Sequence, residues 1–143
     1  MKVDALPKPT AVIPHRKPFL YVDEITYCDH TSVVGRYRFG DEPFFEGHFP
    51  GNPVVPGVIL VEGLAQTLAY LAIREVGGDT VLLTGIDGCK IRRPVLPGEE
   101  VTYRVEVLKH KLKMVVAKGV VEVAGETSVT VTLKGYIRSS ATT

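Results

Sequence analysis

Two residues in the stretch EGHFPGNPVVPGVILVEGLAQ (residues 46–66) have side chains suited to proton transfer, His48 and Glu62. An imidazole with a pKa of about 7 can act as a general base at neutral pH. A carboxylic acid inside an apolar segment loses hydration, which raises its pKa and keeps its proton available for donation. Gln66 follows Glu62 by four positions, so on a helix it adds a second polar group to the same face. The stretch therefore predicts acid–base catalysis.

Both residues also have an alternative interpretation that involves no chemistry. A histidine between glycine and phenylalanine is commonly structural, and Glu62 alternatively pairs with a distant arginine, Arg92 or Arg93. His15, in IPHRKPF, is at least as consistent with a structural hydrogen bond as with catalysis. No HExxH motif and no cluster of Cys and His at ligand spacing occurs, so we expect no metal and no cofactor.

The elements that must position these residues can be predicted from apolar patterning and turn residues. An apolar segment at residues 58–76 predicts one long buried helix, with Pro56-Gly57 at its start and Gly77-Gly78 at its end. A turn-rich loop at residues 40–56 precedes it, and a loop of this length is commonly functional. Six β-rich segments complete the chain, at residues 20–29, 31–39, 80–93, 99–109, 112–123 and 126–138.

These elements predict an α+β fold in which a curved antiparallel sheet of about six strands wraps around one central helix. We expect a single domain over residues 1–143, with an irregular lead-in at 1–12 and a disordered tail at 139–143. An open sheet has two edges, which favours dimerisation by edge pairing. A turn is expected at residues 109–111, between the fourth and fifth strands.

Composition restricts the function classes. The chain has 143 residues, of which 45% are hydrophobic and 23% charged, and a formal net charge of +1 argues against nucleic-acid binding. Cys28 and Cys89 are expected to be free thiols in a reducing compartment. The first residues, MKVDALPKPT, contain no secretory signal, so we expect a cytoplasmic protein. The segment at 54–73 contains Pro56 and Glu62 and is expected to be a buried helix rather than a membrane insertion.

The segment GHFPGNPVVPGVILVEGLAQ closely resembles the active-site segment of the FabZ-type β-hydroxyacyl-acyl carrier protein dehydratases. IPHRKPFLYVDEI, DEPFFEGHFP and GIDGCKIRRPVLPGEEV resemble other signatures of that family, in the same order, and the resemblance covers most of residues 13–137. It implies a hotdog fold and dehydration of (3R)-3-hydroxyacyl-acyl carrier protein to the trans-2-enoyl form in fatty acid biosynthesis. It also implies a homodimer with shared active sites, assembled as a trimer of dimers.

The resemblance further implies roles for single residues. His48 matches the catalytic histidine and Glu62 the catalytic carboxylate, at a spacing of fourteen (62 − 48). Gly57 matches the glycine whose N–H holds the thioester carbonyl. Val54 matches the residue whose carbonyl oxygen orients the imidazole. The predicted substrate pocket adds three residues, Phe49, Pro56 and Gln66.

An acidic carrier protein calls for a basic docking surface. Basic residues occur in the two signatures that flank the active-site segment, and a solvated basic face with no docking role is the alternative. The candidates are Arg16, Lys17, Lys90, Arg92 and Arg93.

The sequence departs from the pattern of the family it resembles in ways that bear on specificity. Related isomerising dehydratases have aspartate where this chain has Glu62, which favours dehydration alone. Leu82 and Leu83 stand where some members have an aromatic gate. Two other functions remain open, a hotdog acyl-thioesterase and a non-catalytic acyl-thioester-binding module; retention of both His48 and Glu62 argues against each.

Overall fold

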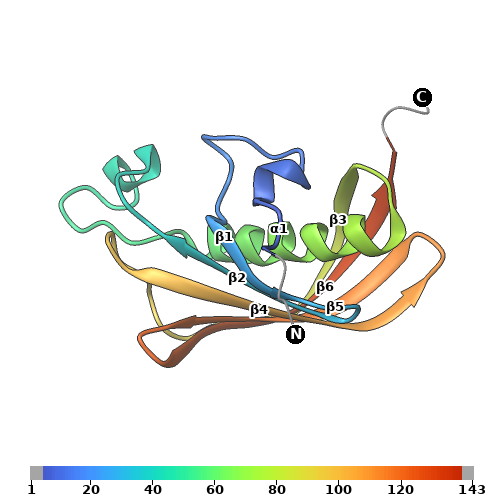
Figure 1. The fold of residues 1–143 in the computed structure, drawn as a ribbon. Coiled ribbons are helices and arrows are strands. Elements are labelled where there is room, and N and C mark those ends of the chain that lie inside the picture. Colours follow the sequence, from blue (N-terminus) through green and yellow to red (C-terminus); the bar gives the residue numbers. More distant parts are fainter. Residues whose placement is uncertain (1–4, 140–143) are drawn as a thin grey trace.

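A six-stranded antiparallel sheet curls around one long helix, which lies across its concave face (Figure 1). The computed structural model describes residues 5–139. This is the α+β architecture predicted from the sequence. In chain order the elements are a 3₁₀ turn Pro9–Ala11, β1 Glu24–Cys28, β2 Ser32–Arg38, a 3₁₀ turn Pro43–Glu46, α1 Gly57–Val76, β3 Thr80–Ile91, β4 Glu100–Lys111, β5 Met114–Val123 and β6 Glu126–Arg138.

The strands are arranged in the order β1-β2-β4-β5-β6-β3, so β1 and β3 form the two edges of the sheet. Residues alternate between the two faces of each strand: in β5, Val115, Ala117 and Val121 are buried against α1 while Lys118 points outward. The edge strand β3 differs, because most of its twelve residues are exposed, including Ile86 and Ile91. An exposed apolar edge is a surface suited to strand pairing.

The helix α1 is apolar on nearly all sides because protein surrounds it. Gly63 allows it to lie against the sheet, since a Cβ at this position would come within 2.2 Å of the Tyr103 ring. Two turns further along, the Tyr70 hydroxyl donates a hydrogen bond to the carbonyl of Pro7 in the lead-in (2.7 Å). Its length and hydropathy would also fit a membrane span, but its place inside the sheet is that of a core helix.

Several predicted boundaries require correction. The first strand, expected at 20–29, is only Glu24–Cys28, since Leu20, Tyr21 and Val22 are buried beside α1 without joining the sheet. The turn expected at 109–111 lies instead at Leu112-Lys113, because a bulge between Val107 and Lys109 shifts the register and β4 continues to Lys111. Both cysteines are free, as expected. The lead-in at residues 5–12 contains only the 3₁₀ turn; the rest of it, and the expected tail beyond Ser139, lie outside the described residues.

Candidate active site

His48 lies in the loop between the 3₁₀ turn Pro43–Glu46 and α1, and backbone hydrogen bonds hold it on both sides. Its N–H donates to the carbonyl of Phe44 (2.9 Å), and its carbonyl accepts from the N–H of Val54 (2.8 Å). The loop ends where the N–H of Val55 donates to the carbonyl of Val95 (2.8 Å). The histidine is therefore fixed within its own loop and not by the central helix.

The imidazole of His48 has a defined tautomer. Its Nδ1 lies 2.8 Å from the carbonyl oxygen of Val54, and a carbonyl oxygen only accepts hydrogen bonds. Nδ1 therefore carries the proton, and in the neutral ring Nε2 keeps a free lone pair. The ring of Phe49 stacks on the imidazole, with centroids 4.2 Å apart. In this arrangement Nε2 is free to accept a proton.

Glu62 lies in the second turn of α1, beside a small cavity. The cavity is lined mainly by apolar side chains, among them Leu68, Val81 and Leu83, so the carboxyl group has little contact with water. Burial raises the pKa of Glu62, and a hydrogen bond from Gln66 opposes part of that rise. Such a carboxyl group retains its proton to higher pH than a solvated one and can act as an acid.

Gln66 joins Glu62 to a distant part of the chain. Its amide nitrogen Nε2 donates to Glu62 Oε2 (3.0 Å) and to the carbonyl of Phe19 (3.1 Å). Its Oε1 accepts from the N–H of Tyr21 (2.8 Å). The side chain is fully buried, and these bonds fix which end is nitrogen. The sequence indicated a polar group on this helix face, but not that it ties the face to residues 19–21.

His15 is a further neighbour of Glu62, with its Nε2 3.7 Å from Glu62 Oε2. Its Nδ1 is buried without a partner among the described residues. Burial, and secondarily the charge of Arg16, lowers the pKa of His15. Sequence reasoning left its role open between structure and catalysis, because nothing in IPHRKPF indicates that it faces residue 62. The predicted alternative, a pair between Glu62 and Arg92 or Arg93, does not occur in this structure.

Gly57 is the first residue of α1, and Pro56 precedes it as the N-cap. The N–H groups in the first turn of a helix have no partner within the helix, and they carry partial positive charge. Gly57 packs against β3 so closely that a Cβ would meet the Ile91 side chain at 2.4 Å. A larger residue here would require Ile91 to move, so glycine lets the helix start pack directly against β3.

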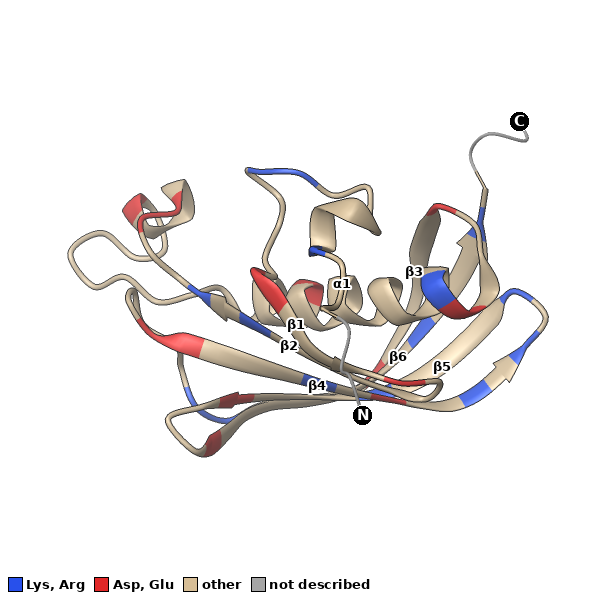
Figure 2. Ribbon diagram, in the orientation of Figure 1, with Lys and Arg blue, Asp and Glu red and all other residues tan. Residues whose placement is uncertain are grey.

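The five predicted docking residues fall into two groups. Arg16 donates to backbone carbonyls, including that of Ile13 (2.9 Å), and Arg93 forms ion pairs with Glu99 (3.2 Å) and Glu126 (3.0 Å). The other three are exposed and form no ion pair with another described residue: Lys17, Lys90 and Arg92. Figure 2 shows where basic and acidic residues lie along the ribbon.

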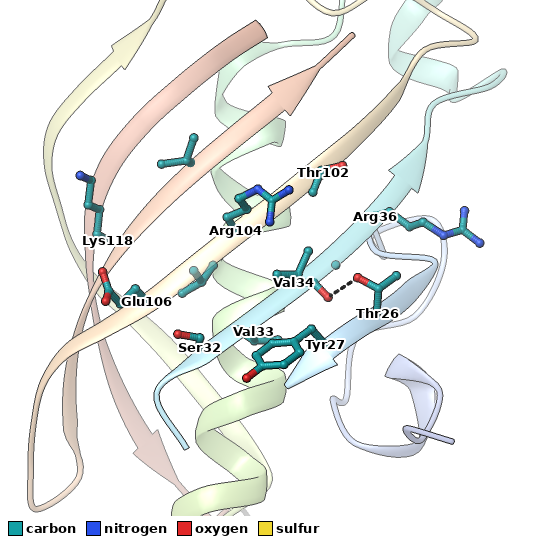
Figure 3. A pocket seen from close by; sticks show the side chains of 13 residues that line it. Thr26, Tyr27, Ser32, Val33, Val34, Arg36, Thr102, Arg104, Glu106 and Lys118 are labelled. Carbon is teal, nitrogen blue, oxygen red and sulfur yellow. Dashed lines mark hydrogen bonds between the residues drawn. The ribbon is translucent and has the colours of Figure 1, made fainter. Parts of the chain in front are cut away.

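A second, wider hollow lies on the outward face of the sheet, where Tyr27, Arg36 and Arg104 extend from β1, β2 and β4 (Figure 3). None of the predicted site residues lines it, so it is separate from the candidate site. Within residues 5–139, no group of three or more His, Cys, Asp or Glu side chains is placed to bind a metal.

Comparison with known proteins shows the family of the chain. Residues 13–132 match the FabA-like domain. A protein of Anaeromyxobacter sp., named 3-hydroxyacyl-[acyl-carrier-protein] dehydratase FabZ, is 42% identical over 135 residues, covering 89% of this chain and 84% of the relative. A protein of the same name from Caulobacter vibrioides is 44% identical over 119 residues, covering 79% and 75%.

Solved structures match the fold at lower identity. The dehydratase heterocomplex ApeI:P from Xenorhabdus doucetiae superimposes with a TM-score of 0.82 at 15% identity, covering 95% of this chain and 94% of that one. A hypothetical thioesterase from Streptococcus pneumoniae, solved with coenzyme A, gives a TM-score of 0.64 at 14% identity, covering 81% and 85%. Both confirm the hotdog architecture, and at such identity they say nothing about the reaction.

Proposed function

We propose that this chain, which belongs to the family of FabA-like domains, removes water from 3-hydroxyacyl-acyl carrier protein in fatty acid biosynthesis. The proposal rests on the complementary protonation states of two side chains, His48 and Glu62. His48 has a free Nε2 because Val54 holds its other nitrogen, and Glu62 has a raised pKa because it is buried. One group is ready to take a proton and the other to give one.

The chemistry follows from these states. His48 Nε2 removes a proton from C2 of the 3-hydroxyacyl thioester, and negative charge develops on the thioester oxygen. The N–H of Gly57, at the positive end of α1, stabilises that charge. Glu62 then donates its proton to the departing 3-hydroxyl group, so that water leaves and a trans-2-enoyl thioester remains. A proton lost to solvent by His48 and one regained by Glu62 complete the cycle.

The site is proposed to lie between two protomers. Within residues 5–139, His48 forms hydrogen bonds or ring contacts with Phe44, Phe49 and Val54, whereas Glu62 lies beside Gln66 and His15, and no hydrogen bond joins the two sets. The cavity beside Glu62 is bounded by the exposed edge strand β3. Pairing of β3 with β3 of a second copy would extend the sheet and bury its apolar residues, and it brings the His48 loop of one copy toward Glu62 of the other. A trimer of such dimers is the expected assembly.

Subunit mixing tests the shared site. Inactive His48→Ala protein is mixed with inactive Glu62→Gln protein under conditions that exchange subunits, with exchange verified by differently tagged chains. One site of each mixed dimer then contains both changes and the other contains neither. Random exchange makes about half the dimers mixed, so activity should return to about a quarter of wild type. If verified exchange restores no activity, each site is built within one chain.

Product analysis tests the reaction itself. With 3-hydroxyacyl thioesters of several chain lengths, the expected product is the 2-enoyl thioester, detected by mass spectrometry. Free 3-hydroxy acid as the main product would identify a thioesterase instead. Stoichiometric binding without turnover would identify an acyl-thioester-binding module.

Carrier docking is proposed at the three exposed cations Lys17, Lys90 and Arg92. Reversal of charge at Arg92 should raise KM for carrier-bound substrate far more than KM for a small thioester mimic, because only the carrier extends beyond the pocket. Lys8→Glu is the matched control, an exposed lysine outside this group. Equal effects of Arg92→Glu on both substrates would place docking elsewhere.

A further inference from the structure

The turn between β4 and β5 is built from residues that neither turn geometry nor burial explains. Leu112 has a φ of 55° and a side chain that is 82% exposed. This left-handed backbone conformation disfavours bulky side chains, and Gly, Asn or Asp are the residues that usually adopt it. The next hairpin, Ala124-Gly125, also places a non-glycine residue in this conformation, Ala124 with a φ of 51°, but there the side chain is only a methyl group. A large apolar side chain held out at Leu112 therefore suggests a contact with something outside this chain.

The outward face beside this turn is a hollow with an apolar floor and a cationic rim. Met114, Val116 and Tyr136 form the floor, and Lys109, Lys111 and Lys113 surround it. Strand register explains the arrangement, since Lys109 pairs with Val116, Lys111 with Met114 and Met114 with Tyr136 across β4, β5 and β6.

The rim receives no compensating negative charge from the residues that the structure describes. No carboxylate lines the hollow, and none of the three rim lysines forms an ion pair with another residue in the range 5–139. Figure 2 shows the basic segments gathered at this hairpin. The hairpin lies at the opposite end of the molecule from the loop at residues 40–56 (Figure 1).

We propose that this hollow docks the protein reversibly on a bilayer surface containing anionic phospholipids. An anionic lipid has a phosphate that matches the lysine rim and apolar chains that match the floor, with Leu112 positioned to enter the acyl boundary. Lysine side chains suit such a surface because their stems lie along apolar groups while the ammonium reaches the phosphates. This is a peripheral contact, distinct from insertion of α1.

Two other occupants fit less well. Pairing of β3 edges extends the sheet in its own plane and leaves the outward face uncovered, so the proposed dimer does not fill the hollow. A second copy placed face to face on the hollow would bring two sets of lysines together, which repel each other. The inference goes beyond the proposed dehydration and does not depend on it.

Vesicle co-sedimentation tests the proposal with the full chain. Wild-type protein should bind vesicles of equal phosphatidylglycerol and phosphatidylcholine, release at high salt, and show little binding to phosphatidylcholine alone. Lys111→Glu/Lys113→Glu should weaken binding by at least about 25-fold, since each basic residue near an anionic surface contributes roughly fivefold. Lys8→Glu/Lys118→Glu changes net charge equally, outside the rim, and should weaken binding much less; Lys118 lines the hollow in Figure 3 instead.

Leu112→Asn separates the apolar contribution from the charge. Asparagine tolerates a φ of 55°, so the variant should fold with equal or greater thermal stability, yet bind anionic vesicles several-fold more weakly. Absence of wild-type binding to phosphatidylglycerol vesicles at low salt would overturn the proposal. Equal losses of vesicle binding in the two charge-reversal variants would also overturn it, as would unchanged binding of Leu112→Asn. The same holds if the only effect of the rim variants is a change in oligomer size on gel filtration.

Discussion

The two halves of the candidate site are held in place by different kinds of interaction. His48 depends on backbone groups of residues close in sequence: the carbonyls of Phe44 and Val54 and the N–H of Val54. Glu62 depends on the side chain of Gln66, whose other partners, Phe19 and Tyr21, lie 47 and 45 positions earlier in the chain. The proposed base is thus positioned locally, and the proposed acid through long-range packing.

This difference determines which substitutions should matter. Backbone groups survive most side-chain changes, so apart from His48 itself the histidine loop should tolerate substitutions that keep those backbone groups. A buried side-chain network fails when one member is removed, because its partners lose their hydrogen bonds in a place that water does not reach. Four predictions test this contrast.

The largest effect is expected from the reacting groups themselves. His48→Ala removes the base and Glu62→Gln removes the acid, and each should lower the rate of dehydration by on the order of 100-fold or more. Enoyl thioester formation gives the rate, and circular dichroism checks that the fold is intact. Near-normal turnover in either variant would show that the pair does not act as base and acid.

Gln66→Leu should give the next largest effect, on both activity and stability. The change leaves the Tyr21 N–H and the Phe19 carbonyl without their Gln66 partner. Each buried group that loses its hydrogen bond should lower the free energy of unfolding by about 1–3 kcal/mol. Glu62 loses its positioning bond as well, and a fall of roughly tenfold in kcat is expected. Urea denaturation and steady-state kinetics measure the two effects, and an unchanged unfolding midpoint would contradict the network.

The third prediction concerns pH and stability. The pKa of Glu62 is raised from its ordinary 4.5, so the folded protein holds this proton more tightly than the unfolded chain does. The resulting contribution to stability is complete below pH 4.5 and is lost as pH rises through the folded pKa. The Glu62→Gln variant has no ionisable group at this position. As pH rises from 4 to 8, the melting temperature of the variant should therefore rise relative to that of wild type. A constant difference across that range would mean that burial does not perturb the carboxyl group.

The same contrast explains how much could be predicted from the sequence. His48 and Val54 lie in one proline-rich loop, so a short motif is enough to relate them, and the apolar run around Glu62 was enough to predict its raised pKa. His15 and the partners of Gln66 come from the lead-in, and no pattern in one sequence reports which distant backbone groups a helix face will meet. The turn at Leu112-Lys113 was misplaced for a related reason, since it lacks the glycine or asparagine that marks such turns.

Val54→Ala should have the smallest effect on kcat. It tests whether backbone contacts alone position His48. The Val54 contacts with His48 use only its backbone N–H and carbonyl, which alanine retains. The change should therefore leave kcat within about threefold of wild type, even though Val54 adjoins the proposed base.

Val54→Pro is the matched variant, because proline keeps the carbonyl but lacks the N–H that donates to the His48 carbonyl. It should reduce kcat more than alanine does while changing the unfolding midpoint less than Gln66→Leu does. If alanine proves as damaging as proline, the Val54 side chain contributes to holding His48, and backbone contacts alone do not position the base.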